Sequence, residues 1–330
     1  MIDVTVVLLD GGLPSTSLAP LEIFACAGSF WGELTGAPAE PRFRVRTATI
    51  DGRKTRNLVP VALEPAVALG DVGRTDLLIV PTAGIDLEQA RTANAGVIDW
   101  IKSHSPKTAV AGICTGVTLL AAAGLLDGRP ATTHWGVVDR CRAMYPRVDW
   151  KPDRLVTEAG NVFCGGGLYA SIDLSLYLVE HYCGHMVAVQ TAKALLVEMP
   201  RIWQSTYAPQ PPRSTHDDEA IKRAQEHLVA HFREPVDLDA LAAKVGMSPR
   251  NFARRFKTAT GDAPLAYVHR LRVDRARHYL ESAHRSVEEI SREIGYEDVA
   301  FFRKLFRRHT GTSPREYRAR FGPSRGAGSP

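Results

Sequence analysis

The residues of this sequence that could do chemistry fall into two groups, and the first is centred on Cys114. Cys114 lies between Gly112 and Gly116, where an apolar segment runs without a gap into a predicted helix. Glycines two positions before and after a nucleophile permit the sharp, strained turn of a nucleophile elbow. Such a turn presents the thiol above a sheet edge, where a helix N-terminus can lower its pKa. The spacing predicts a reactive thiol or the wall of a ligand pocket, with a small core residue as the plainer interpretation.

The second group is basic and belongs to a motif that occurs twice near the C-terminus. The copies begin near Leu241 and Ile290, and each contains a short helix with an apolar stripe, a glycine, and a second helix with two phenylalanines four residues apart. The spacing from the first phenylalanine to a final tyrosine is the same in both copies, over residues 252–267 and 302–317. Two short helices joined by a glycine turn predict a helix-turn-helix, whose second helix lies in the DNA major groove.

The faces opposite the phenylalanines are the predicted reading surfaces. Arg250 and Arg254 lie four residues apart near the start of their helix, so both can point into the groove. Arginine forks pair with guanine O6 and N7 and give roughly 1–3 kcal/mol of discrimination each. Further polar residues share these faces, and the four cations among them are predicted to contact phosphate or only solvent: Asn251, Arg255, Lys257, Arg307 and Arg308.

The segment between the two copies is predicted to be one helix over residues 264–280, because it has good helix formers and a single apolar stripe. A helix of this length is roughly 25 Å long. It could hold the two reading helices about one DNA turn, ~34 Å, apart, so that one chain reads two successive major grooves.

Paired helix-turn-helices, a long linking helix and a Gly-x-x-Pro-x-x-Tyr ending resemble the AraC/XylS family of bacterial transcription regulators over residues 217–321. The resemblance implies double-stranded promoter DNA as a partner and is compatible with RNA polymerase as a further partner. It also implies that six residues occupy base-reading positions: Arg250, Ala253, Arg254, Val299, Arg303 and Lys304.

The elements that must position Cys114 alternate between strands and helices. Apolar strands are predicted over residues 4–9, 43–49, 76–80 and 108–113, with short strands near 131–133, 156 and 162, and helices over 18–30, 87–103 and 168–181. Uninterrupted apolar strands that alternate with helices predict a mostly parallel sheet covered on both faces. The expected fold is therefore a three-layer α/β domain followed by an all-α domain with two helix-turn-helices.

The elbow and residues 123–135 resemble the DJ-1/PfpI branch of the class I glutamine-amidotransferase-like superfamily, over residues 1–199. The complete arrangement resembles the GlxA-type regulators. This resemblance implies a flavodoxin-like, DJ-1-like sheet, a homodimer, and a pocket for a small metabolite effector. The candidate pocket residues are Cys114, Thr115, Glu22, His134, Thr16 and Gly84.

Thr16 argues against catalysis. In catalytic relatives such as isocyanide hydratases, an acidic residue six positions before the helix glutamate hydrogen-bonds the cysteine sulfur. Counted from Glu22 that position is Thr16, whose hydroxyl cannot replace a carboxyl group in proton transfer. We therefore expect a metabolite-controlled regulator and not an enzyme. A hydratase-like or amidase-like enzyme with a DNA-binding appendage and an architectural DNA-binding protein stay as alternatives, and His134 could equally cap backbone at a strand end.

Bulk properties agree with a two-domain, DNA-binding protein. The 330 residues suggest domains at 1–199 and 217–321, a Pro-rich linker at 200–216 and a disordered tail at 322–330. Residues 215–330 hold 22 Lys and Arg against 16 Asp and Glu, whereas residues 1–214 hold 19 against 20. The positive balance thus accompanies the doubled motif. Five cysteines without metal-ligand spacing and no apolar run of ~20 residues predict a reduced, cytoplasmic protein without metal, cofactor or membrane contact.

Overall fold

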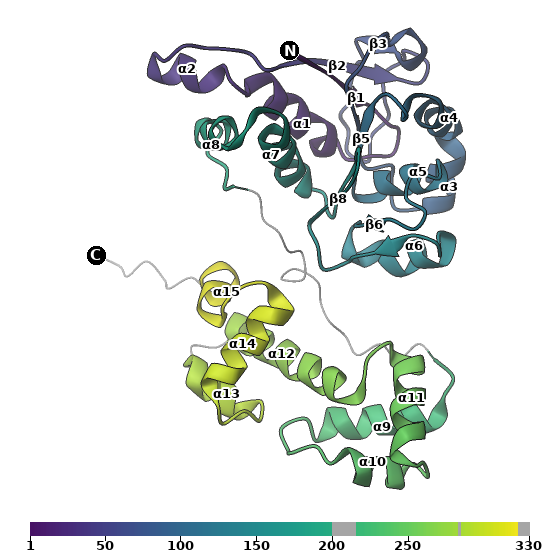
Figure 1. Cartoon of the computed structure of the whole chain (residues 1–330), viewed down its shortest axis with the longest axis vertical. Coiled ribbons are helices and arrows are strands. Elements are labelled where there is room, and N and C mark those ends of the chain that lie inside the picture. Colours follow the sequence, from purple (N-terminus) through teal and green to yellow (C-terminus); the bar gives the residue numbers. More distant parts are fainter. Residues whose placement is uncertain (200–215, 283–284, 323–330) are drawn as a thin grey trace. The chain divides into compact units, whose positions relative to one another are not determined.

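The computed structural model describes residues 1–199, 216–282 and 285–322. The chain divides into two compact units, Met1–Gln204 and Ser205–Pro330 (Figure 1). Except for residues 216 and 322, the predicted linker and tail lie outside the described residues, and the domain bounds given above stay predictions. None of the helices in the described ranges is long and apolar enough to cross a membrane.

The first unit contains a seven-stranded sheet in the order β3-β2-β1-β4-β5-β9-β8, with a separate pair, β6-β7. Neighbouring strands of the large sheet run parallel, except that β8 is antiparallel to β9. The mostly parallel sheet predicted from the apolar strands is confirmed. The strands are β1 (Ile2–Val7), β2 (Phe43–Thr49), β3 (Val67–Ala68), β4 (Leu77–Val80), β5 (Ala109–Ile113), β6 (Pro130–Ala131), β7 (Asp149–Trp150), β8 (Val156–Ala159) and β9 (Val162–Gly165).

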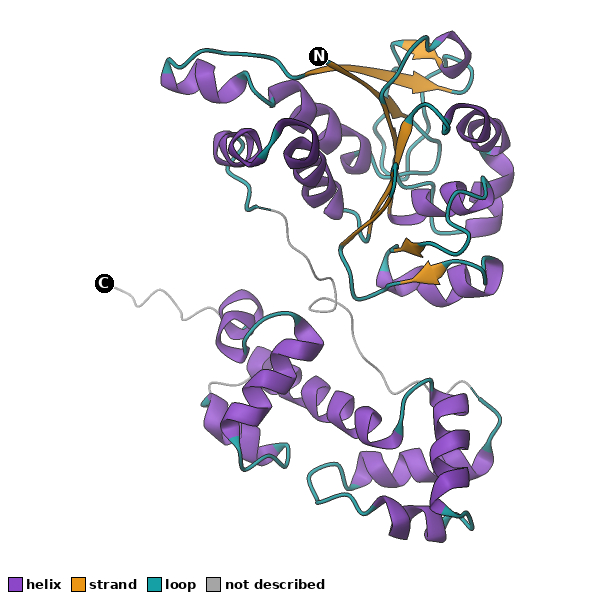
Figure 2. Ribbon diagram, viewed as in Figure 1, coloured by secondary structure: helices purple, strands orange, loops and turns teal. Residues whose placement is uncertain are grey.

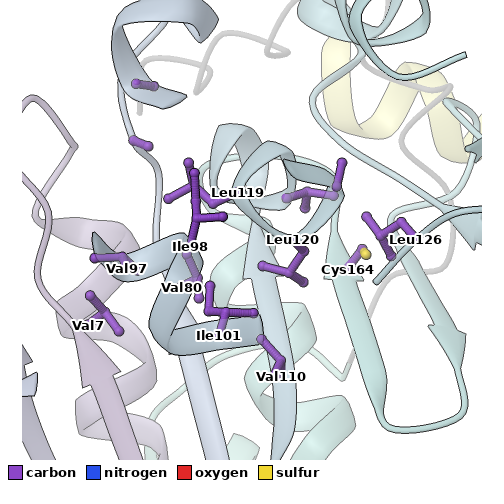
Figure 3. Packing of buried hydrophobic residues seen from close by; sticks show 14 of the residues in the cluster. Val7, Val80, Val97, Ile98, Ile101, Val110, Leu119, Leu120, Leu126 and Cys164 are labelled. Carbon is purple, nitrogen blue, oxygen red and sulfur yellow. The ribbon is translucent and has the colours of Figure 1, made fainter. Parts of the chain in front are cut away.

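Helices cover both faces of this sheet (Figure 2). On one face, Phe24 and Leu174 belong to a buried cluster with strand residues of β1, β4 and β5. On the other, Figure 3 shows Ile101 and Leu120 packed against Val80 and Val110. The first face carries α1 (Ser15–Cys26), α7 (Ala170–Cys183) and α8 (His185–Ala194); the second carries α3 (Leu87–Ala93), α4 (Ala95–His104) and α5 (Val117–Ala122); α2 (Phe30–Thr35) and α6 (Val138–Met144) complete the unit.

Two predicted elements of this unit differ from the structure. The helix predicted over 87–103 is interrupted at Asn94, which ends α3 and whose side chain donates to the carbonyl oxygen of Ala90 at 2.8 Å. A polar side chain that bonds its own backbone in this way favours a helix end over a helix interior. The strand predicted near 131–133 is only the two-residue β6, and it belongs to the small sheet.

In its described residues, the second unit contains helices and the loops that join them, and no strand. Its two helix-turn-helices end alike, because α11 and α14 both stop at a left-handed glycine, Gly261 (φ 81°) and Gly311 (φ 80°). The linking helix predicted over 264–280 is α12, which continues for two more residues to Ser282. The helices are α9 (Glu219–Ala230), α10 (Leu238–Lys244), α11 (Pro249–Thr260), α12 (Pro264–Ser282), α13 (Val287–Glu293), α14 (Val299–Thr310) and α15 (Pro314–Phe321).

The phenylalanines of the doubled motif form equivalent cores. Phe256 packs edge-on against Tyr267 with ring centroids 5.3 Å apart, and Phe306 packs edge-on against Tyr317 at 5.5 Å. All four rings are fully buried. The repeated spacing in the sequence therefore corresponds to a repeated packing unit, and the reading faces lie opposite these rings.

Candidate functional site

The reading face of α11 is open to solvent. Arg250, Ala253, Arg254 and Lys257 are exposed, while the phenylalanines on the opposite face are buried. Arg254 donates a hydrogen bond to the side-chain oxygen of Asn251 at 2.9 Å, which orients its guanidinium along the helix surface. The two arginines selected from their spacing are therefore both available to a DNA groove.

Arg255 has a different environment from its neighbour. Its guanidinium donates to both carboxylate oxygens of Asp218, at 2.8 and 2.9 Å. Asp218 in turn caps α9 by accepting from the backbone N–H of Ile221 at 3.2 Å. Burial alone would raise the pKa of Asp218, but the hydrogen bonds from Ile221 and Arg255 and the charge of Arg255 hold it below its usual value. Arg255 thus ties α11 to α9, a role that the sequence pattern did not suggest.

The reading face of α14 is also basic. Arg303, Lys304 and Arg307 are exposed, and Val299 is half-buried. Arg303 donates to a carboxylate oxygen of Glu288 at 2.6 Å. The repeat offset of 50 residues, from Phe252 to Phe302, puts exposed Ala300 at the position equivalent to Arg250. The repeat offset thus indicates Ala300 as a further candidate beside Val299.

Cys114 has the backbone expected of an elbow. It follows β5 directly, begins the 3₁₀ turn Cys114–Gly116 and has φ of 55°, in the left-handed region. A Cβ on Gly116 would lie 2.1 Å from the carbonyl oxygen of Pro81, and a Cβ on Gly112 would lie 3.0 Å from Val117 Cα. The flanking glycines are therefore needed for the close packing of the turn. The carbonyl oxygen of Cys114 accepts from the Thr133 hydroxyl at 2.8 Å.

The thiol of Cys114 is buried, and its pKa is raised. It is 5% exposed, and burial raises its pKa despite the opposing effects of the Thr115 backbone N–H and the Thr82 hydroxyl. Desolvation therefore opposes the lowering of the pKa that a helix N-terminus can give. Thr82, which follows β4 and faces the sulfur, is a site residue that sequence reasoning missed.

Three predicted pocket residues gather around the segment that follows β4. The Thr16 hydroxyl accepts from the Thr82 backbone N–H at 3.2 Å and donates to the carbonyl oxygen of Leu13 at 2.7 Å. The Thr115 hydroxyl accepts from the Ala83 backbone N–H at 3.1 Å, and Gly84 follows with φ of 93°. Thr16, Thr115 and Gly84 thus lie at one rim with Cys114, as the C-terminal ends of parallel strands require.

Comparison with known proteins agrees with this geometry. Residues 33–181 match the family model described as the DJ-1/PfpI family. The chain is 36% identical over 194 residues to an isonitrile hydratase of Pseudomonas putida, covering 52% of this chain and 76% of that protein. The chain belongs to the DJ-1/PfpI family. The crystal structure of DJ-1beta from Drosophila melanogaster has the same fold, with a TM-score of 0.50 at 21% identity over 60% of this chain and 98% of that one.

The second unit decides the class of protein. Residues 241–320 match a family model described as a helix-turn-helix domain. The chain is 29% identical over 254 residues to the HTH-type transcriptional regulator CdhR of Pseudomonas aeruginosa, covering 76% of this chain and 74% of that protein. This DJ-1/PfpI protein therefore carries an AraC-type domain and is a DNA-binding transcriptional regulator, as the resemblance implied.

The two remaining pocket candidates of this DJ-1/PfpI domain, Glu22 and His134, have other environments than Thr16, Thr115 and Gly84. Glu22 is exposed on α1. Burial is the main cause of the raised pKa of Cys26, and the charge of Glu22 raises it further. His134 accepts from the backbone N–H of Gly136 through Nδ1 at 3.0 Å, and burial lowers its pKa. Of the two interpretations of His134, this hydrogen bond favours backbone capping, and the neutral ring keeps Nε2–H as a donor.

The other cysteines have no feature of a reactive or metal-binding thiol. Burial raises the pKa of Cys141 and of Cys164 to about 12. In the part of the chain that the structure describes, no group of three or more His, Cys, Asp or Glu side chains could hold a metal ion.

Proposed function

We propose that this regulator binds promoter DNA through α11 and α14 as a cytoplasmic homodimer, and that a small metabolite bound at the Cys114 elbow controls it. The left-handed backbone of Cys114 is the observation that carries the sensing part. A non-glycine residue in such a conformation costs of order 1–3 kcal/mol and persists where the surrounding structure enforces it, commonly at functional sites.

The side chains around the elbow favour ligand binding over nucleophilic chemistry. Apart from the sulfur of Cys114, the Thr82 hydroxyl has no hydrogen-bond partner within the described residues. A buried hydroxyl without a full partner costs about 1–3 kcal/mol, which a ligand that accepts its proton would recover. Thr16 offers a hydroxyl where an acid would be needed, and the thiol of Cys114 has a raised pKa. A small polar ligand with a hydrogen-bond acceptor fits these groups.

The DNA-binding part of the proposal rests on the exposed arginines of α11 and on the length of α12. Arg250 and Arg254 occupy successive turns near the start of α11, so their forks can reach two neighbouring base pairs. The 19 residues of α12 give a rod of roughly 28 Å, comparable with the ~34 Å of one DNA turn. Ligand would act by favouring one arrangement of the two DNA-binding units that already exists in the free protein.

Titration of metabolite pools into the purified protein tests this function, with thermal stability and promoter footprinting as the two readouts. A ligand present at 100 times its Kd should stabilise the protein by about 2.7 kcal/mol. Thr82→Val should remove the hydroxyl that donates to the ligand, and the stabilisation with it, while leaving DNA binding unchanged. Protection of DNA without stabilisation by any pool would reject sensing, and no footprint on any promoter would reject the regulator itself.

The similarity to an isonitrile hydratase favours one second candidate, a DJ-1/PfpI enzyme with a DNA-binding appendage. Iodoacetamide labelling separates the two, since an enzyme of this type needs a thiolate near neutral pH. We expect Cys114 to label more slowly at pH 7 than free cysteine, as mass spectrometry of the Cys114 peptide would measure. Rapid labelling that a nitrile-like or isocyanide substrate blocks would support the enzyme instead.

A further inference from the structure

One buried arginine of the linking helix contacts both the segment that precedes the first helix-turn-helix and the turn of the second. Arg272 lies midway along α12 and is only 7% exposed although it carries a charge. Its guanidinium donates to the carbonyl oxygens of Phe232 and Glu234, both at 2.7 Å, in the segment between α9 and α10. It also donates to the carbonyl oxygen of Gly295 at 3.0 Å, in the turn of the second motif. One side chain therefore links the segment that leads into the first motif to the turn of the second motif.

The chemistry of these contacts requires an arginine. Three acceptors in different directions match the planar guanidinium, which offers five N–H donors in a rigid arrangement, whereas lysine offers one flexible ammonium. The ring of Tyr296 lies 4.8 Å from the central carbon of the Arg272 guanidinium and adds a cation–π contact. The position of Arg272 is thus determined by partners on both sides of α12.

The turn glycines of the two motifs provide an internal comparison. A Cβ on Gly295 would lie 2.2 Å from the carbonyl oxygen of Arg233, which precedes α10. The equivalent Gly246 of the first motif has open space around its position, at a similar φ of 73° against 86°. The second turn, unlike the first, therefore packs directly on the backbone of the segment that joins α9 to α10. Arg233 reinforces this contact through an ion pair of 2.6 Å with Glu293.

We propose that Arg272 is a positioning residue that sets the spacing between the two DNA half-sites that α11 and α14 can read together. The proposal rests on DNA binding by both motifs. One added base pair moves the second half-site by ~3.4 Å and rotates it by roughly 35°. With the contacts of Arg272 and Gly295 intact, the reading helices cannot follow this change. Phe252 and Phe302 belong to different hydrophobic clusters, so each motif should keep its own core when these contacts are weakened.

The test uses the full chain and an operator selected by the wild-type protein from a random DNA pool. Dissociation constants are measured for this operator and for derivatives with one base pair inserted or deleted between the half-sites. The wild type should lose about tenfold or more in affinity on either change, the equivalent of one base contact. Arg272→Lys should lose no more than roughly threefold, because its two motifs can reorient.

Two control variants make this outcome specific. Arg275→Lys changes an exposed arginine of the same helix in the same way and should keep the wild-type ratio of affinities. Gly295→Ala should relax the spacing preference like Arg272→Lys, whereas Gly246→Ala, which introduces similar backbone strain into open space, should not. Circular dichroism establishes that each variant is folded, and the glycine pair serves as the test if Arg272→Lys is not.

The possible results separate this proposal from the function it rests on. If Arg272→Lys and Gly295→Ala bind the operator and discriminate against altered spacing as strongly as the wild type, Arg272 does not set the spacing. If the wild-type protein selects no sequence at all, DNA reading itself fails. A uniform loss of affinity on every spacing would also overturn the positioning role, since it would indicate only a weakened fold.

Discussion

Two adjacent arginines of α11 should respond in opposite ways to replacement by alanine. Arg254 is exposed on the reading face, while Arg255 forms the paired hydrogen bonds with Asp218 that tie α11 to α9. We expect Arg254→Ala to change DNA recognition and leave the fold intact. We expect Arg255→Ala to weaken the fold and leave the preferred sequence intact.

The expected magnitudes follow from these environments. Loss of a guanine contact by Arg254 should relax discrimination at one base pair by ~1–3 kcal/mol, roughly 5- to 150-fold, with stability changed by less than about 0.5 kcal/mol. The side chains of Arg255 and Asp218 are 39% and 20% exposed, so solvent screening limits their ion pair to about 1 kcal/mol. For a unit of this size that loss lowers Tm by about 4 °C.

The assay combines selection of DNA from a random pool with urea unfolding. All five tryptophans of the chain lie before residue 204, so tryptophan fluorescence follows the first unit and far-UV circular dichroism follows both. Arg255→Ala should shift the dichroism transition and leave the fluorescence transition in place. The reasoning is refuted if Arg255→Ala relaxes the base preference at unchanged stability, or if Arg254→Ala selects the same sequences as the wild type.

Further predictions concern the elbow and the cap of α9. Gly116→Ala should destabilise the first unit by about 3 kcal/mol or more, because its Cβ would meet the Pro81 carbonyl oxygen at 2.1 Å. Gly124→Ala, whose Cβ would meet open space, should cost only about 1 kcal/mol. Urea unfolding followed by tryptophan fluorescence measures both values. Asp218→Asn should lower the unfolding free energy at pH 7 and have a progressively smaller effect as the pH falls below about 4. The pKa of this carboxyl is held low, so its stabilisation is present above the unfolded value of ~4 and is lost as pH falls through the folded value; a difference that grew on acidification would contradict this.

Periodic and local features were predictable from the sequence. The strand at residues 43–49 has the predicted bounds, and α12 contains the whole predicted linking helix. Both depend on apolar spacing that any packed arrangement must satisfy. The elbow at Cys114 was predictable for a similar reason, since Gly116 marks a close backbone approach that a side chain would prevent.

The partners of polar side chains were not predictable in this way. Arg255 reaches Asp218 across 37 positions, and Arg272 reaches Phe232 across 40, so only the folded chain brings these groups together. In the sequence, Arg254 and Arg255 are neighbours of the same type with no feature that separates a reader from an anchor. The raised pKa of Cys114 was missed because a helix N-terminus is visible in a sequence, whereas the extent of desolvation is not.

We expect the two motifs to bind DNA with unequal strength, and this inequality would give the rigid linkage a purpose. Helix α11 begins after Ser248, and Arg250 and Arg254 are exposed on it. Arg303 of α14 is paired with Glu288, and α14 begins after Asp298. The second helix should therefore bind DNA more weakly alone. A weak reader gains most from being held at the correct position, because the first contact then supplies its effective concentration. The contacts of Arg272 would let a poor second site contribute sequence information that a flexible linkage would lose.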